Sequence, residues 1–87
     1  MAYFAEISNN EVMQVIAISN TDVDNLPFPE SEPIGQAFIA SLGIVGEWLQ
    51  TSYNATFRGA YAGIGFTFDP LLGEYGEFVA PVALPVE

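Results

Sequence analysis

TSYNATFRGAYAGIGFTFD, residues Thr51 to Asp69, is the stretch that decides the predicted fold. It interleaves aromatic side chains with small residues, contains three glycines and carries Arg58, the only basic residue of the chain. Aromatic residues favour β-strands, and glycine within a strand admits a bend or the close approach of a second backbone. We therefore predict a twisted strand over Tyr61–Phe68, with its large side chains filling a core and its glycines shaping the sheet.

N-terminal to this stretch, the pattern predicts a β-hairpin. Tyr3–Ile7 and Val12–Ile18 are rich in β-favouring residues, and the SNNE sequence between them contains two asparagines. Asparagine tolerates the positive φ angles that a tight hairpin turn requires. The second run is apolar on nearly both faces, so we expect it to lie centrally in a sheet.

A single helix is predicted over Glu32–Leu42. Ser31 is a favourable cap, Pro33 suits the first turn, and Gly43 is placed to end the helix. Gly35 is a weak point within the helix, because glycine has a low helix propensity. Apolar side chains recur at helical spacing and are expected to face the sheet: Ile34, Ala37, Phe38 and Leu42.

Two further strands complete the predicted sheet, at Glu47–Tyr53 and from Tyr75 or Glu77 to Ala80. Residues 19–30 form a loop, because Asn, Asp and two prolines interrupt any periodicity. The predicted fold class is α+β: a small antiparallel sheet of four or five strands with one helix packed on a face. Residues 1–80 form one domain in this prediction, and residues 81–87 form an extended C-terminal arm.

Composition excludes several classes of partner. The formal net charge is −10, from eleven acidic residues against one arginine. Nucleic-acid affinity and binding to anionic membranes both depend on basic side chains, so we expect neither. The longest uncharged run, Pro33–Gly46, falls short of the ~20 apolar residues that span a bilayer. The N-terminus lacks the pattern of a secretory signal, so a soluble protein made in the cytoplasm is expected.

No cofactor or metal is expected. The chain has no cysteine and no histidine, which removes the most common metal ligands. The glycines between Gly59 and Gly65 superficially suggest a phosphate-binding loop, but a P-loop lysine is missing. Asp22, Asp24 and Asn25 could in principle hold a cation, although their spacing does not match an EF-hand. An ordinary acidic loop is the simpler interpretation.

Enzyme activity is not expected either. Glu74 with Glu77, or Glu30 with Glu32, are carboxylates close in sequence, and such pairs can cleave glycosides when their environments differ. Nothing else in so short a chain indicates a sugar cleft. Scattered acidic residues are usually a solvated surface.

Arg58 is expected to be paired with a carboxylate. Its planar guanidinium favours a bidentate carboxylate partner or stacking on an aromatic ring. We predict a structural ion pair with Asp69, with Glu47 as an alternative partner. A salt bridge to a neighbouring subunit is the other interpretation of the same residue.

The C-terminal arm is the best candidate for a partner-binding segment. It combines two prolines with aliphatic side chains, which can lie along a neighbouring protein and bury apolar surface. A tail that folds back over its own sheet, or that has no fixed structure, is the competing interpretation. The predicted partner-binding residues are Pro81, Val82, Leu84, Pro85 and Val86.

Four blocks of the sequence carry a family resemblance. They are YFAEISNNEVMQVIAI near the start, WLQTSYN in the middle, then FRGAYAGIGFTFD, and EFVAP toward the end. Together they resemble a family of small structural proteins encoded by tailed bacteriophages, notably phages of marine cyanobacteria. The chain departs from the family pattern by extra residues between Asp69 and Phe78 and by its final VALPVE, so these parts are not carried over.

The resemblance implies a virion component, and charge and size favour a particular location. We expect a non-enzymatic capsid decoration or cement protein on the outer shell, because an acidic inner surface would repel packaged DNA. Its expected partners are other virion proteins, above all subunits of the major capsid protein, and copies of itself. A tail, fibre or baseplate component is the first alternative. An acidic phage-encoded module that binds a host protein is the second.

Overall fold

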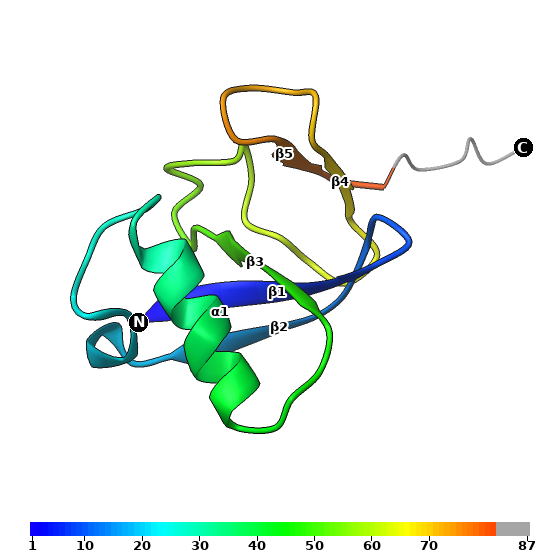
Figure 1. The fold of residues 1–87 in the computed structure, drawn as a ribbon. Helices are drawn as coiled ribbons and strands as arrows, with labels where there is room; N and C mark the ends of the chain where they lie inside the picture. Colours follow the sequence, from blue (N-terminus) through cyan, green and yellow to red (C-terminus); the bar gives the residue numbers. More distant parts are fainter. Residues whose placement is uncertain (82–87) are drawn as a thin grey trace, which may run out of the picture.

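A β-hairpin at the N-terminus begins the fold. In the computed structural model, which describes residues 1–81, β1 (Ala2–Ser8) pairs antiparallel with β2 (Glu11–Ile18) (Figure 1). Asn9 and Asn10 form the turn between them, with φ angles of 52° and 64°. Both values lie in the left-handed region that a two-residue hairpin turn needs and that asparagine tolerates. The predicted hairpin is confirmed.

Three more strands extend the hairpin into a five-stranded antiparallel sheet with the order β3-β1-β2-β4-β5. β3 (Glu47–Thr51) pairs with β1 along its whole length. β4 (Thr67–Asp69) and β5 (Glu77–Val79) form a short hairpin that meets β2 only where Glu11 pairs with Thr67. The predicted α+β class, with a small antiparallel sheet and one α-helix, is therefore confirmed for the described part of the chain.

The helix α1 (Ser31–Ser41) packs on one face of the sheet, within one residue of its predicted bounds at each end. Phe4 of β1 is fully buried beneath it. A Cβ at Gly35 would lie 2.1 Å from Phe4 Cζ, so the glycine lets the helix rest directly on the ring. What the sequence indicated as a weak point is therefore a packing requirement.

This close contact also decides which helix residues face the sheet. The buried positions of α1 recur every four residues, and Phe38 is partly buried beside them. Ala37 and Leu42 are exposed, so the predicted apolar stripe was wrong at these two positions. Gly35 faces Phe4 because a larger side chain would not fit there. The buried residues of α1 are Ser31, Gly35 and Ile39.

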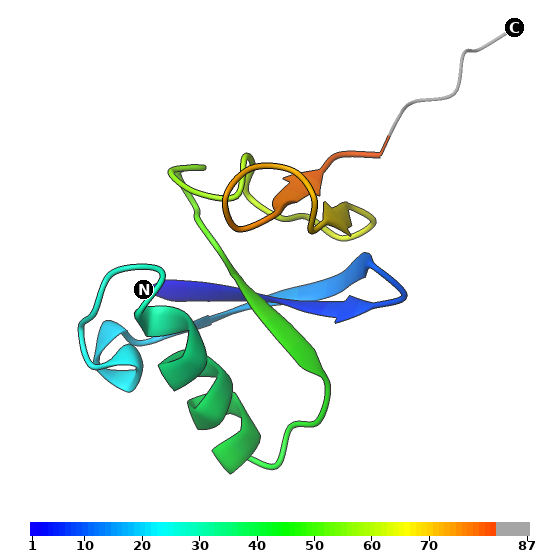
Figure 2. The same cartoon turned by 45° about the horizontal axis from the view of Figure 1, so that its top comes forward.

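The opposite face of the sheet is covered by the chain after β3 (Figure 2). Ala62 and Phe78 pack there against Ala5, Ile7 and Val12. A second hydrophobic cluster on this face thus balances the one under α1, and the β1–β2 hairpin lies between two apolar layers. This burial is the main source of stability for a sheet with both faces covered.

The predicted strand over Tyr61–Phe68 was wrong for most of its length, because regular strand begins only at Thr67. Within this range the chain turns instead of extending: the Phe66 N–H donates to the Gly63 carbonyl at 3.0 Å, and Gly65 has a positive φ of 90°. The stretch is instead a covering loop that contributes single side chains to the core. The predicted loop over residues 19–30 is present and contains the short 3₁₀ helix η1 (Asn20–Val23).

The C-terminal arm is described only at its start. Pro81 is exposed. The other predicted partner-binding residues, Val82, Leu84, Pro85 and Val86, lie outside the described residues.

Candidate functional site

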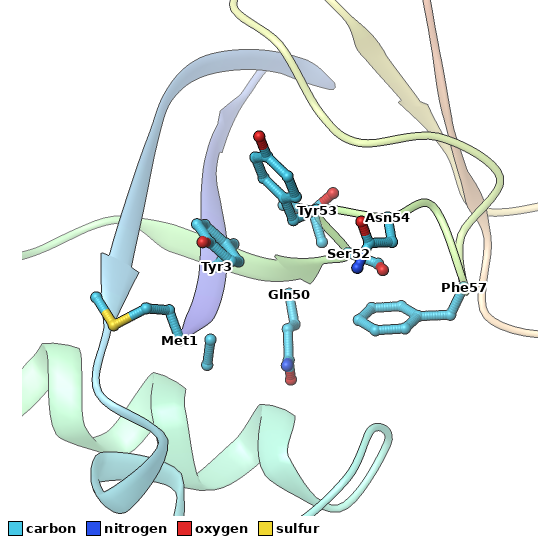
Figure 3. Close-up of a pocket in the computed structure, with 9 residues that line it drawn as sticks. Met1, Tyr3, Gln50, Ser52, Tyr53, Asn54 and Phe57 are labelled. Carbon is cyan, nitrogen blue, oxygen red and sulfur yellow. The ribbon is translucent and has the colours of Figure 1, made fainter.

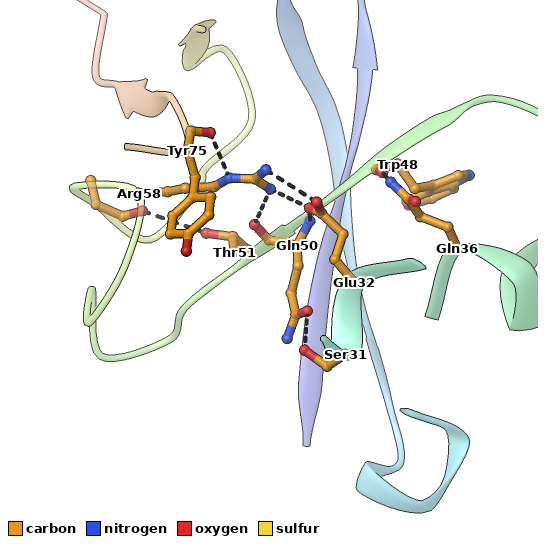
Figure 4. A network of polar contacts seen from close by, with 9 residues as sticks. Ser31, Glu32, Gln36, Trp48, Gln50, Thr51, Arg58 and Tyr75 are labelled. Atoms are coloured by element: carbon orange, nitrogen blue, oxygen red, sulfur yellow. Dashed lines mark hydrogen bonds and ion pairs between the residues drawn. The ribbon is translucent and has the colours of Figure 1, made fainter. Parts of the chain in front are cut away.

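Arg58 lies at the centre of a polar network that joins three separate segments (Figure 4). Its guanidinium forms a bidentate ion pair with Glu32 at the start of α1, through Nη1 to Oε2 and through Nη2 to Oε1 at 3.2 Å. Nη1 also donates to the Gln50 carbonyl of β3 at 3.0 Å, and Nε donates to the Tyr75 carbonyl at 3.1 Å. The Arg58 side chain is only 6% exposed, so its positive charge is used inside the protein.

The predicted ion pair between Arg58 and Asp69 was wrong, and so was the alternative with Glu47. Asp69 accepts a hydrogen bond from the Leu71 backbone N–H at 3.0 Å and thereby orders the turn after β4. The Arg58 guanidinium instead reaches the start of α1, where the fold places Glu32. The expectation that Arg58 pairs within its own subunit agrees with this geometry.

Aromatic rings enclose the guanidinium. Its central carbon lies 5.0 Å from the centre of the Phe28 ring and 5.3 Å from that of Phe68. Phe28 in turn stacks on Phe57, with ring centres 3.9 Å apart. Such cation–π contacts strengthen when water is excluded. The network therefore has a structural role, because four of the five N–H donors of Arg58 are taken by groups of the described residues.

The same network satisfies the outer edge of β3. The Trp48 carbonyl accepts from Gln36 Nε2 at 2.6 Å, and the Gln50 N–H donates to Glu32 Oε2 at 2.8 Å. Arg58 completes the row by donating to the Gln50 carbonyl. Side chains thus occupy three of the outward backbone groups of β3, and an additional strand could pair at this edge only by displacing them.

A pocket of about 310 Å³ opens beside the N-terminal end of β1 (Figure 3). Its lining side chains are aromatic, amide or hydroxyl groups, together with the aliphatic side chains of Met1 and Ala2, and no carboxylate or guanidinium is among them. Amides and hydroxyls can orient a polar molecule by hydrogen bonds, but they do not provide a strong general base at neutral pH. The main lining residues are Tyr3, Gln50, Ser52, Tyr53, Asn54 and Phe57.

Three tyrosines gather next to this pocket. The ring centres of Tyr3, Tyr53 and Tyr61 lie 5.3 to 5.8 Å from one another. Burial raises the pKa of Tyr61 above its ordinary value, and the neighbouring Tyr3 and Tyr53 phenols add to the rise. A raised pKa keeps the Tyr61 phenol protonated to higher pH. The group is therefore not an activated phenolate at neutral pH.

The other motifs of the sequence have structural roles. Asp22 accepts from the Ser19 N–H and caps η1. The chain between Gly59 and Gly65 covers the sheet, where Ala62 donates its N–H to Thr51 Oγ1 at 2.9 Å. Among residues 1–81 the structure contains no group of three acidic side chains placed to hold a metal ion. Within the same residues, no helix has the length and apolar character needed to cross a membrane.

Two exposed apolar groups stand out on the surface. The helix-end group consists of Leu42, Ile44 and Val45, between α1 and β3. The hairpin-tip group consists of Leu71, Leu72 and Tyr75, between β4 and β5. Val45 is 87% exposed and Leu71 is 90% exposed. The connections that carry the two groups lie at opposite ends of the molecule (Figures 1 and 2).

Comparison with known proteins gave no match to a protein-family model, to a curated protein or to a solved structure.

Sequence reasoning missed the partner of Arg58 and the closing of the β3 edge. In the sequence, Glu32 stands out only as the first residue of the predicted helix and as a carboxylate next to Glu30, and Gln36 does not stand out at all. Arg58 and Glu32 are 26 residues apart in the chain. The signal that could have indicated the pair is the uniqueness of Arg58 together with an acidic residue at the first turn of the only predicted helix.

Proposed function

We propose that this protein is a non-enzymatic structural protein of a tailed-bacteriophage particle, and more specifically a decoration or cement protein on the outer face of the capsid. The observation that carries the proposal is the exposure of two apolar groups at opposite ends of an acidic molecule. Contiguous exposed apolar residues mark contact surfaces more often than single ones do. A protein that bridges two shell subunits needs two such surfaces.

The charge supports the outer face of the shell. At a net charge of −10, with Arg58 already paired to Glu32, the protein offers an attractive surface to basic protein partners. The same charge would repel DNA packed inside the capsid. The sequence resemblance to phage structural proteins points to the same class of assembly. The partners in this proposal are subunits of the major capsid protein, together with copies of the protein itself.

Mass spectrometry of purified particles tests the proposal. We expect the protein on the particle in many copies, in a fixed ratio to the major capsid protein. A few copies per particle would favour the tail, fibre or baseplate alternative. Absence from particles, combined with capture of a host protein by the tagged chain, would favour the acidic host-binding module and would overturn the virion proposal.

Variants then locate the contacts. Val45→Asp and Leu71→Asp each replace an exposed apolar side chain with a charge, so both should fold normally and lower occupancy on the particle. Ala40→Asp, an exposed position on α1, is the matched control because it changes the net charge equally. Equal occupancy for all three variants would remove both apolar groups from the contact.

The predicted role of the C-terminal arm needs a separate variant. A chain that ends at Ala80 lacks the predicted partner-binding residues and keeps every described strand and helix. We expect it to fold and to lose attachment to particles. Attachment at the normal level would contradict a role of the arm and leave the two exposed apolar groups as the contacts.

A further inference from the structure

The outer edge of β2 is free along most of its length. β4 pairs with β2 only at Glu11, and the segment before β4 reaches only Val12, whose N–H donates to the Phe66 carbonyl at 2.7 Å. From Met13 to Ile18, no described residue pairs with the side of β2 that faces away from β1. We call this segment, Met13–Ile18, the free edge.

The free edge lacks most of the usual protection. Native proteins protect an exposed edge with lysine, proline, an inward charge, a bulge or a covering segment. The sequence MQVIAI contains no charge and no proline, and a bulge occurs only at its first residue, Met13. Met13 is 50% exposed, Ala17 is exposed, and Val15 and Ile16 are half-buried. Such a row of backbone groups with apolar side chains on both faces is a template for an added strand.

The charges around the free edge indicate what kind of strand fits. Glu11 is exposed at one end, and Asp22 and Asp24 follow at the other end, in and directly after η1. Glu6 lies on the neighbouring strand, where it accepts from Gln14 Nε2 at 2.8 Å. A segment that lies along the edge therefore has an apolar middle opposite Met13–Ile18 and acidic groups near both of its ends.

We propose that the free edge of β2 binds an extended segment of a partner protein as an added strand, with an apolar centre and basic residues on both flanks. Backbone hydrogen bonds supply the binding, and the acidic flanks select for basic residues. As a statement about a virion partner, the proposal rests on the proposed function and gives that partner's chemistry. The binding site itself requires only the described edge and its charges.

A second copy of the chain fits this edge less well. If two β2 strands paired antiparallel along Met13–Ile18, Glu11 of each copy would approach Asp22 and Asp24 of the other. Carboxylates would then face carboxylates at both ends, between two molecules that each carry a net charge of −10. Self-pairing would consequently strengthen as salt screens this repulsion, whereas binding of a basic segment weakens with salt.

A synthetic peptide tests the proposal directly. The probe is the capped peptide KKVTVTVTKK, titrated into isotope-labelled full-length protein and followed by NMR. We expect saturable shifts of backbone amides within Met13–Ile18 and their protection from hydrogen exchange. The same peptide N-methylated at four successive central positions cannot form the ladder, so it should bind at least about tenfold more weakly. The peptide EEVTVTVTEE should also bind at least about tenfold more weakly, because its flanks are repelled.

A pair of protein variants supplies the second control. Met13→Lys with Ala17→Lys places lysines on two exposed positions of the free edge, and Ala40→Lys with Leu71→Lys changes the net charge equally at other exposed positions. The first variant should lose peptide binding by about tenfold or more relative to the second. Circular dichroism of both confirms that they fold.

Three results would overturn the proposal: undiminished binding of the methylated peptide, shifts that map away from β2, or salt-strengthened dimerisation through β2 that the probe does not reverse. The experiment on purified particles tests the virion assignment separately from the strand-binding site. Peptide binding at β2 by a protein absent from particles would keep the strand site and remove the virion assignment. A protein that is found on particles but does not bind the peptide would keep the virion assignment and remove the strand site.

Discussion

The two edges of the β1–β2–β3 sheet present the same kind of backbone to their surroundings, yet only one of them is closed. Along β3, the outward carbonyls of Trp48 and Gln50 and the Gln50 N–H are taken by Gln36, Arg58 and Glu32. Along β2, the segment Met13–Ile18 has no described partner on its outer side. Side chains therefore bind the outward backbone groups of β3, whereas no described side chain does so along Met13–Ile18 of β2.

The cost of closing an edge explains why the difference is informative. The β3 edge takes the only basic residue of the chain, a carboxylate from the first turn of α1, the one α-helix among residues 1–81, and an amide from its second turn. An unprotected strand edge in the same protein risks aggregation unless a binding partner pairs with it. From this contrast we infer that the outer edge of β3 serves the fold itself, whereas the outer edge of β2 serves contact with other molecules.

Arg58→Met should have the largest effect on this comparison. The variant removes the charge while keeping most of the volume, and it leaves the Glu32 carboxylate partly buried without its partner. Breaking a buried ion pair from one side costs about 3 kcal/mol or more. Urea denaturation should show this loss of stability. Amide hydrogen exchange along β3 should become faster and approach the fast exchange that we expect for the open edge of β2 in the native protein.

The double variant Arg58→Met with Glu32→Gln serves as the control. The neutral amide can still accept from the Gln50 N–H, so part of the lost stability should return. If the single variant lost less than about 1 kcal/mol, comparable to one ordinary hydrogen bond, Arg58 would not be what holds the β3 edge.

Gly35→Ala should rank second. The added methyl group would overlap the buried Phe4 ring, whose Cζ lies 2.1 Å from the ideal Cβ position. Forcing a methyl group into a packed core costs typically about 1–3 kcal/mol. Because α1 carries Glu32 and Gln36, lifting the helix should loosen the β3 edge and leave the β2 edge unaffected. Hydrogen exchange measured residue by residue distinguishes the two.

Ala37→Gly is the matched control for Gly35→Ala, since Ala37 is exposed on the same helix. It should cost only the helix propensity of alanine over glycine, about 1 kcal/mol, without a change in exchange at β3. A stabilising effect of Gly35→Ala would show that propensity outweighs the contact with Phe4.

Gln36→Ala should have a smaller effect, of about 1 kcal/mol, because it removes one hydrogen bond to the Trp48 carbonyl. It opens the middle of the β3 edge while the ion pair remains. Light scattering at high protein concentration should then show more self-association than in the native protein. Gln36→Glu, which loses the amide donor but places a charge at the same edge, should show less, because edge charges oppose strand pairing.

Local patterns in the sequence were sufficient for the hairpin and the helix. Two asparagines between β-favouring runs predicted the first, and a capping serine, a first-turn proline and a terminal glycine predicted the second. The sheet order and the free edge could not be predicted in this way. They depend on where the segment that contains Phe66, about 50 residues after the hairpin, pairs with it. The contacts of this segment with Val12 fix that position.

The stretch Thr51–Asp69 shows how a correct observation led to a wrong element. Its aromatic and small residues do serve the core, since Ala62 and Phe66 pack on the sheet. They do so from a loop, because the chain turns between Gly63 and Phe66, and residue types that favour extended backbone do not reveal this turn. The Arg58 partner was missed for a related reason: acidic residues near in sequence were considered first, whereas the true partner is brought near by the fold.

Tyr61→Phe should have the smallest effect, and only at alkaline pH. Tyr61 belongs to the loop that rests on the Thr51 end of β3, so its ionisation reports on how firmly this loop holds that end. Its pKa is raised in the folded protein, so folding favours the protonated phenol. The resulting stability is complete below the unfolded pKa of about 10 and is lost as pH rises through the higher folded value. Urea denaturation between about pH 9 and pH 11 should therefore show a shallower fall for Tyr61→Phe than for the native protein. Identical slopes in the two proteins would mean that the loop opens before Tyr61 ionises, and that the β3 edge is held by Arg58, Glu32 and Gln36 alone.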